Sequence, residues 1–262
     1  MLIVVDGACD LPPALRDCEE VVVVPFHVLL AGSPFVGKDD EFDALLCSGA
    51  KLSSAPPGDE LFTAAFGDHR DILVVTASTY LSAAVEAATF SARRALADVR
   101  IVDSRTFSAG SGLVVNALRE AIADGIAVSE LGKLCGQIVE ATHTYAIVDR
   151  PQVLVGHGLL GKVRLSHLFC HPVLGIRDRA RLLRQTRSRK RAIAWLIHHL
   201  RETLGRPPTA WAVAHASSPD IDGIVATLRE VFHSEPVFVT TMNPTAAIHL
   251  GHGAVVVAVR AP

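Results

Sequence analysis

Four short runs of apolar, mostly β-branched residues constrain the fold of this chain more than any other feature. They occupy residues 2–5, 21–24, 72–75 and 99–102. None of them alternates apolar with polar residues, which is typical of parallel strands buried on both faces. Residues 82–97 and 112–124 repeat apolar side chains at helical spacing and are long enough for crossover helices. This order predicts an α/β fold in which residues 1–145 form a Rossmann-like, doubly wound parallel sheet.

The sequence changes character after residue 141, and residues 146–262 are predicted to form a second α/β domain. Its expected elements are helices at 192–204 and near 221–232, and strands at 209–214, 236–240 and 254–259. No repeat or low-complexity linker separates the two halves of the chain. We therefore expect a tight junction between the domains, with a cleft along it.

Composition narrows the classes of function. The chain has 262 residues, half of them apolar, and a formal net charge of −2, which gives no general attraction to nucleic acid. No run approaches the roughly 18 apolar residues of a membrane span, and the start lacks a basic leader, so a cytoplasmic protein is expected. The five cysteines are scattered without a Cys-x-x-Cys pair, which favours buried reduced thiols over disulfides or zinc ligands.

Several polar segments lie where predicted strands end. Asp6 and Asp10 follow the first strand, just before Pro12, and are interpreted as turn or N-cap residues unless they have a functional role. Residues 52–58 and 78–84 are two loops rich in hydroxyl groups and proline. Residues 102–104 and 108–114 combine an Asp-Ser pair with a glycine-spaced helix start. Hydroxyls and helix-start amides are suitable donors for a carboxylate that enters an apolar site.

In this order, and together with 24–28 and 248–254, these segments resemble the DegV family over nearly the whole chain. The family begins with Asp-Ser-x-x-Asp-Leu-Pro and carries Thr-Ser-Gln-Pro-Ser-Pro and Ser-Ser-x-Leu-Ser-Gly-Thr loops. It has His-x-Gly-Pro-Gly-Ala near the C-terminus. This chain departs from those motifs where Gly7, Leu52, Ala83 and Ala84 replace serine, threonine, glycine and threonine, and where His252 replaces proline.

The resemblance implies a two-domain fold with a long-chain fatty acid in a tunnel between the domains. It also implies that Ser53, Ser82, His249 and Arg187 hold the fatty-acid carboxylate, with Ser53 substituting for the lost threonine. A histidine can donate a hydrogen bond in either protonation state, and an arginine offers a planar fork. A separate kinase with a dihydroxyacetone-kinase-like nucleotide domain would phosphorylate the carboxyl group. This chain would then be a lipid-binding subunit, not an enzyme, without cofactor or metal.

The run from Arg177 to Arg191 holds seven arginines and one lysine against a single aspartate. Such a run is usually a solvated face. Its excess of charge nevertheless predicts a docking surface for an acidic partner, namely the kinase. An anionic membrane surface in transient contact is the next candidate.

Other functions are open from the residues alone. The segment from Gly156 to Gly161 matches Gly-x-Gly-x-x-Gly, and 153–155 is interpreted as a strand end, so a nucleotide-dependent enzyme is the alternative function. A third possibility is a diverged carrier of another amphiphile that is no longer coupled to a kinase. The twelve histidines include no His-Glu-x-x-His, and no Gly-x-Ser-x-Gly is present, which disfavours metal and serine-hydrolase chemistry.

Overall fold

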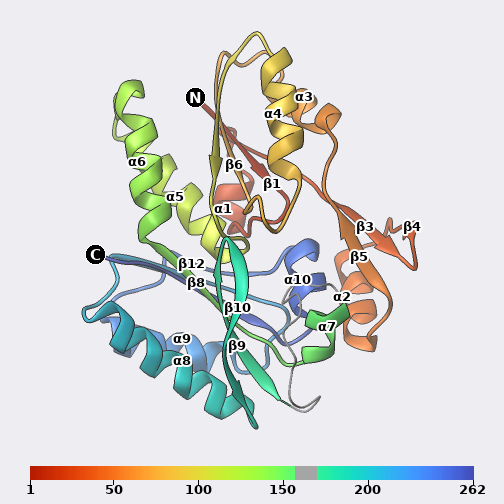
Figure 1. Cartoon of the computed structure of the whole chain (residues 1–262), viewed down its shortest axis with the longest axis vertical. Helices are drawn as coiled ribbons and strands as arrows, with labels where there is room; N and C mark the ends of the chain where they lie inside the picture. Colours follow the sequence, from red (N-terminus) through yellow and green to blue (C-terminus); the bar gives the residue numbers. More distant parts are fainter. Residues whose placement is uncertain (157–169) are drawn as a thin grey trace.

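The structure, a computed structural model, describes residues 1–156 and 170–262 (Figure 1). The first half of the chain is built on a parallel sheet of four strands in the order β2-β1-β6-β7. These strands are β1 (Leu2–Asp6), β2 (Val21–Val24), β6 (Asp71–Thr76) and β7 (Asp98–Asp103). The four predicted runs are therefore strands of one sheet, as expected.

Helices cover both faces of this sheet, which confirms the doubly wound prediction. They are α1 (Pro13–Arg16), α3 (Asp59–Phe66), α4 (Ala84–Arg94), α5 (Ala109–Ala123) and α6 (Val128–Ala141). On one face Leu118 and Leu131 pack with Val5, and on the other Phe62 packs with Val4. Successive residues of a strand face opposite sides of the sheet, so a strand covered by helices on both faces needs apolar residues at every position.

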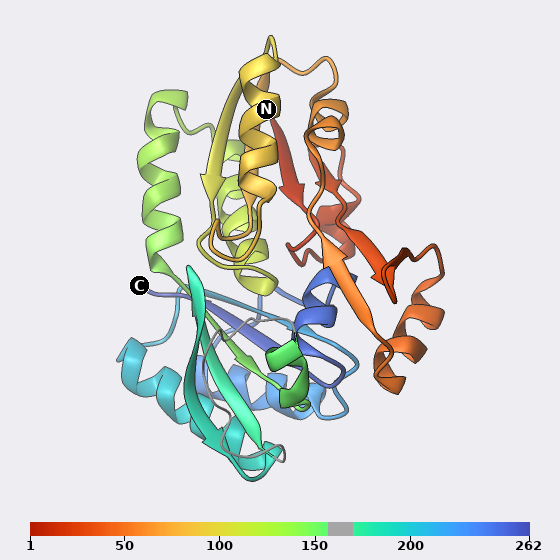
Figure 2. The same cartoon turned by 45° about the vertical axis from the view of Figure 1, so that its right-hand side comes forward.

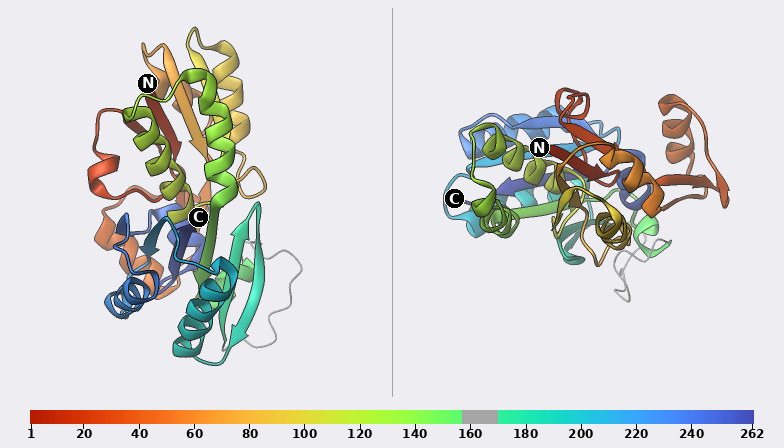
Figure 3. Two further views of the ribbon diagram at one scale, coloured as in Figure 1. Left: turned by 90° about the vertical axis from the view of Figure 1, so that its left-hand side faces the viewer. Right: turned by 90° about the horizontal axis from the view of Figure 1, so that it is seen from above.

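The second half of the chain is built on a mixed sheet of six strands in the order β10-β9-β8-β13-β11-β12. These are β8 (Thr142–Ile147), β9 (His171–Arg177), β10 (Arg179–Thr186), β11 (Ala210–His215), β12 (Phe238–Thr241) and β13 (Val255–Arg260). Helices α8 (Arg189–Leu204) and α9 (Ile221–Phe232) cover one face, where Leu196 and Leu228 pack with Trp211. In Figure 3 this sheet and its helices form the lower part of the molecule.

Helix α5 lies between the two sheets. Its Leu113 packs with Ala146 and Ala212 of the second sheet, while Val114 and Leu118 pack into the first. The glycines of its first turn permit this closeness, because a Cβ on Gly112 would stand 2.0 Å from the carbonyl oxygen of Asp10. The junction between the halves is thus a packed apolar layer, and the cleft expected along it stays a prediction.

A third, small antiparallel sheet projects beside the junction, in the order β4-β3-β5 (Figure 2). It comprises β3 (His27–Leu30), β4 (Ser33–Pro34) and β5 (Leu52–Ala55), together with α2 (Asp39–Ser48). The short helices α7 (Pro151–Gly156) and α10 (Pro244–Leu250) lie beside it. Leu46 and Leu52 of this unit join the apolar cluster at the junction.

The structure around residues 142–156 differs in detail from the sequence predictions. Residues 153–155 lie in helix α7, so the prediction of a strand end before the glycines was wrong. Strand β8 begins at Thr142 and pairs with β13 and β9, so the second sheet starts a few residues before the predicted domain boundary. The boundary itself stays a prediction. None of the helices that the structure describes is long and apolar enough to span a bilayer.

Candidate functional site

A hydrogen bond between Ser54 and His249 marks the candidate site. The Oγ of Ser54, on β5, lies 3.1 Å from Nε2 of His249, in the last turn of α10. Both residues are half-buried. Asn243 caps α10 by accepting the N–H of Ala246 at 3.0 Å, and this fixes the helix that carries the histidine. When Nε2–H donates to Ser54, the hydroxyl keeps its own proton and can donate it to a carboxylate.

Ser53, the residue predicted for this role, is half-buried on the same strand. Adjacent residues of a strand project to opposite faces, so Ser53 and Ser54 point to different sides of the small sheet. It is the side chain of Ser54 that meets His249. Sequence reasoning missed Ser54 because the strand Leu-Ser-Ser-Ala carries no alternation that shows which serine faces the junction.

Ser82 lies in the loop between β6 and α4, and its Oγ accepts the N–H of Ala84 at 3.0 Å, as a helix-start serine does. The neighbouring Ser78 is fully buried and donates to the backbone carbonyl of Asp178 at 2.6 Å. Ser78 therefore fastens the turn between β9 and β10, whereas Ser82 remains half-buried.

One apolar cluster connects the three segments that carry the predicted serines and histidine. Leu52 precedes Ser53, Leu81 precedes Ser82, and Ile248 precedes His249 in the chain. All three apolar residues pack in the cluster between the two sheets. The sequence therefore brings the three polar segments to the border of a single apolar region, which is the arrangement that an amphiphilic ligand requires.

Arg187 is exposed in the turn between β10 and α8. Another arginine of the same run, Arg189, is mostly buried and paired with acidic side chains. Arg189 forms ion pairs with Asp149 and Asp220, and it also donates to Ser218. The sequence feature that could have separated Arg189 from Arg187 is Ser188. Ser188 is the N-cap of α8, so Arg189 is the first residue of the helix, whereas Arg187 lies in the turn before it.

Two buried carboxylates lie at the carboxyl end of β1. Asp6 accepts the N–H of Ala8 at 3.1 Å and that of Ala77 at 2.7 Å, so it is a turn residue that also joins β1 to β6. Asp10 is not an N-cap, because the cap position of α1 is Pro12. Asp10 accepts the hydroxyl of Ser108 at 2.5 Å. Burial raises the pKa of Asp6 and of Asp10 to about 6, against the opposing effect of these donors.

Glycines permit close approaches of the backbone near the site. A Cβ on Gly7 would lie 2.9 Å from the backbone nitrogen of Phe26, so the missing serine hydroxyl coincides with close packing of two chain segments. Gly251 and Gly253 have φ values of 82° and 84°. Side chains there would meet Val153 and Asp149, so these glycines serve a close approach within the chain itself.

The rival nucleotide loop begins at the end of α7, and its residues 157–161 lie outside the described residues. The helix that precedes Gly156 differs from the strand that a dinucleotide-binding turn follows. Within 1–156 and 170–262, no group of three metal-ligating side chains is found.

Comparisons with known proteins cover the whole chain. The model of the DegV family, described as uncharacterised proteins, matches residues 1–261. A DegV domain-containing protein of Mycobacterium bovis, Mb2440c, is 29% identical over 99% of this chain and 96% of its own length. A DegV family protein of Eubacterium eligens loaded with heptadecanoic acid has a TM-score of 0.88, with 18% identity over 100% of this chain and 99% of that one.

A third similar protein is the fatty acid kinase (Fak) B3 protein of Streptococcus pneumoniae, solved with linoleic acid. It matches with a TM-score of 0.87 and 18% identity over 100% of both chains. The family model spans all but the last residue, and these structures share the two-sheet architecture described above. This chain belongs to the DegV family.

Proposed function

We propose that this protein binds a long-chain fatty acid whose tail lies in the apolar junction and whose carboxylate is held at its border. The observation that carries the proposal is the Ser54–His249 contact, placed against an apolar cluster to which the second sheet, the small sheet and the loops after β1 and β6 contribute. Structures of similar fold hold heptadecanoic and linoleic acid, which supports this ligand class.

The energetics favour such a ligand. Each buried methylene contributes about 0.8 kcal/mol, so a chain of about sixteen carbons gains on the order of 10 kcal/mol before the cost of association. The carboxylate loses its water on entry and needs several donors in return. We propose His249 and Ser82 as donors, with Ser54 added and Ser53 retained. Arg187 is the weakest member of this set, because its exposed guanidinium remains solvated.

We propose further that the protein presents the carboxyl group to a separate kinase and has no nucleotide site of its own. The likeness to the Fak B3 protein of S. pneumoniae supports a kinase partner. An acidic surface of that partner would dock on exposed arginines of the run from Arg177 to Arg191, among them Arg179 and Arg184 on β10. Strand β10 is the edge of its sheet and is accessible from outside.

Mass spectrometry of lipid that co-purifies with the native protein tests the ligand without assuming its identity. A fatty acid at close to one per chain is the expected result. Titration of delipidated protein with palmitate and, separately, with ATP then distinguishes a carrier from a nucleotide-dependent enzyme. Tight ATP binding together with no fatty-acid binding would refute the proposal, and another co-purifying amphiphile would replace the fatty acid as ligand.

A further inference from the structure

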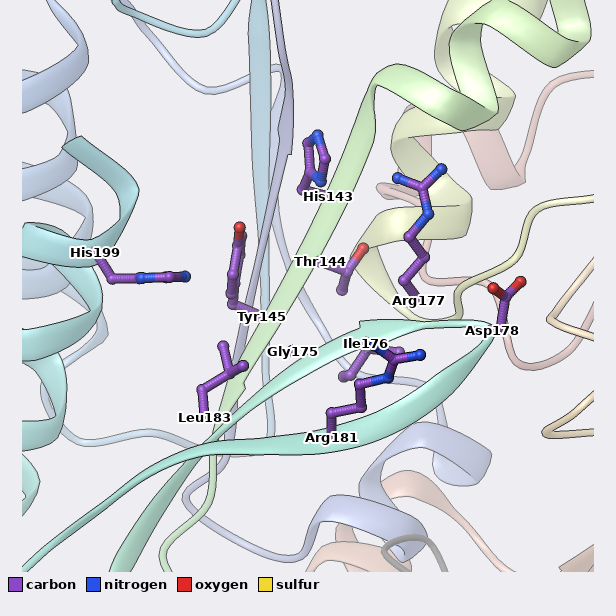
Figure 4. A pocket seen from close by; sticks show the side chains of 10 residues that line it. All are labelled: His143, Thr144, Tyr145, Gly175, Ile176, Arg177, Asp178, Arg181, Leu183 and His199. Carbon is purple, nitrogen blue, oxygen red and sulfur yellow. The ribbon is translucent and has the colours of Figure 1, made fainter. Parts of the chain in front are cut away.

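A recess opens on the face of the second sheet that carries α8, at the end of the sheet that α8 leaves uncovered. Figure 4 shows its lining side chains, which come from three adjacent strands and one helix. His143 and Tyr145 belong to β8, Arg177 to β9, Arg181 to β10, and His199 to α8. The recess has a volume of about 210 Å³, smaller than the pockets that hold drug-sized ligands.

This recess is separate from the proposed fatty-acid site. Tyr145 belongs to the cluster beneath α8, whereas the next residue of β8, Ala146, belongs to the cluster at the junction. Because neighbouring strand residues face opposite sides, the polar side chains of the recess lie across the six-stranded sheet from the junction, and of its lining residues Thr144 and Ile176 belong to the junction side. A ligand in the recess therefore does not compete for the space of a fatty-acid tail.

The charges around the recess leave one cation in excess. Arg177 forms an ion pair with Glu140, and Arg105 binds Asp178 through two hydrogen bonds of 2.7 Å. Arg181, exposed on β10, forms no ion pair with any residue that the structure describes. Its planar fork is available for an oxygen-bearing anion, for which guanidinium geometry is well suited.

Neutral donors complete the set. The ring of His199 meets Tyr145 edge to face at 5.5 Å between centroids and stacks on Trp195 at 4.8 Å. In Figure 4 the imidazole of His199 points toward Tyr145, whose hydroxyl is directed toward His143. Two imidazoles and a phenol thus line the same hollow as the two guanidiniums.

We propose that this recess binds a small tetrahedral oxyanion of the phosphate class, either inorganic phosphate or the phosphate group of a small metabolite. The open side of the recess accommodates the substituent of a phosphate monoester. The arginines supply charge-assisted hydrogen bonds, and the imidazoles and the phenol supply the remaining donors.

Binding of the anion takes up protons. Burial lowers the pKa of His143, and Arg177 lowers it further while Glu140 opposes this; burial and His198 lower the pKa of His199. Arg181 and Asp178 are the other charged groups that line the recess, and Tyr145 is its remaining titratable group. A bound oxyanion favours each imidazolium, so affinity must rise as the pH falls from neutral toward the lowered pKa values.

Sulfate is the first probe, because it does not titrate in the range used. Binding is followed at constant ionic strength through the fluorescence of Trp195, which an imidazolium quenches more strongly than a neutral imidazole. Affinity about tenfold higher at pH 5.5 than at pH 8 is expected, as one linked proton predicts. In the control variant Trp195→Phe the change in fluorescence on sulfate binding should disappear. Its loss would show that the change does not come from the second tryptophan, the buried Trp211.

Variants distinguish a built site from general charge. Arg181→Ala should weaken sulfate binding by about tenfold, the size of one charge-assisted hydrogen bond. His199→Gln lacks the quenching imidazole, so it is titrated by calorimetry beside the native protein, and it should lose most of the pH dependence. Arg201→Ala is the control, since Arg201 is an exposed arginine of α8, the helix that carries His199, and lies outside the recess. It should bind sulfate like the native protein.

Equal affinity in Arg181→Ala and Arg201→Ala, or binding that follows ionic strength alone, would overturn the proposal. Inorganic phosphate and glycerol 3-phosphate, titrated in parallel at one pH, identify the source of the anion. Tighter binding of the ester indicates a metabolite, and tighter binding of the free ion indicates phosphate itself. Failure of both to bind more tightly than chloride would also refute the site.

Discussion

The carboxylate of Asp10 accepts hydrogen bonds from both the backbone N–H and the side-chain amide of Asn243, each at 2.6 Å. Asp10 follows the first strand of the parallel sheet, and Asn243 caps the helix that carries His249. The N-terminal motif that resembles the family opening thus acts on the candidate site indirectly, by positioning α10 rather than by contacting a ligand.

Asp10→Asn should remove a pH dependence of stability. Burial raises the pKa of Asp10 to about 6 in the folded protein, from the 3.8 of a free aspartate side chain. A raised folded-state pKa means that the contribution to stability is fully present below pH 3.8 and is lost as the pH rises through 6. The loss is of the order of 2–3 kcal/mol for a shift of this size.

Chemical denaturation of the native protein and of Asp10→Asn, measured at several pH values from 4 to 7, checks this expectation. Asparagine retains the shape of the protonated acid and cannot ionise, so the variant should show a flatter profile. Asp6→Asn is a second case, because the pKa of Asp6 is raised to about 6 by the same burial. Parallel profiles for all three proteins would contradict the raised pKa values.

Ser54→Ala should weaken fatty-acid binding more than Ser53→Ala does. Removing one donor from a buried carboxylate costs about 1–3 kcal/mol, and only the side chain of Ser54 meets His249. The two serines are adjacent, so each variant serves as the control for the other. Ser82→Ala is expected to cost about the same 1–3 kcal/mol. Calorimetric titration with palmitate measures all three, and equal affinities for the Ser53 and Ser54 variants would place the carboxylate elsewhere.

Gly112→Ala should destabilise the fold severely, whereas Gly132→Ala should stabilise it. Both glycines lie inside helices, but a Cβ on Gly112 meets a backbone oxygen at 2.0 Å and one on Gly132 meets nothing within 4 Å. We expect a loss of about 3 kcal/mol or more at Gly112 from overpacking and a gain of about 0.5–1 kcal/mol at Gly132 from helix propensity. The free energy of unfolding in urea measures both effects. An unchanged free energy of unfolding in Gly112→Ala would mean that α5 can move away from the segment that carries Asp10.

Asp178→Asn should loosen the turn between β9 and β10. The guanidinium of Arg105 lowers the pKa of Asp178 through paired hydrogen bonds. A lowered pKa contributes stability above the unfolded value, and this stability is lost as the pH falls through the folded value. Both side chains are partly exposed, so solvent screening limits the contribution to about 1 kcal/mol.

Hydrogen exchange at the amides of Arg105 and Asp178 measures the loosening. Faster exchange in Asp178→Asn at pH 7, but little difference from the native protein under strongly acidic conditions, is expected. Arg179→Ala in the same turn is the control, because Arg179 only stacks over the ring of Tyr80. If the control exchanges as fast as Asp178→Asn, the paired hydrogen bonds are not what holds the turn.

The sequence predicts the first sheet well because its strands are apolar on both faces. The run of valines in β2 suits a strand covered on both faces, and even at the edge of the sheet its valines are buried or partly buried. Strand β10 was not predicted because its arginines resemble a charged surface segment. The strand lies at the edge of its sheet, and this position is what allows a strand to carry several exposed arginines. The short strand β5 carries too few residues for a period to be seen.

The residues of the candidate site depend on contacts that no local pattern records. The bond between Ser54 and His249 joins positions 195 residues apart, and the choice between two adjacent serines is made by the strand's orientation in space. Likewise the resemblance selects Arg187, whereas the fold buries Arg189 among acidic partners. Family motifs therefore locate the segments, and tertiary packing decides which side chain in each segment takes part.

Helix α5, held on opposite sides by two sheets, also restricts how a ligand can enter. A hinge motion that separated the two large sheets would expose apolar side chains on both sides of α5 at once. The free-energy cost of exposing that much apolar surface is prohibitive. The small sheet with α2 has no second layer beyond it in Figure 3 and can swing outward more cheaply. For the fatty acid proposed above, uptake and release should accordingly proceed through motion of the small sheet and α2, while the two large sheets keep their relative positions.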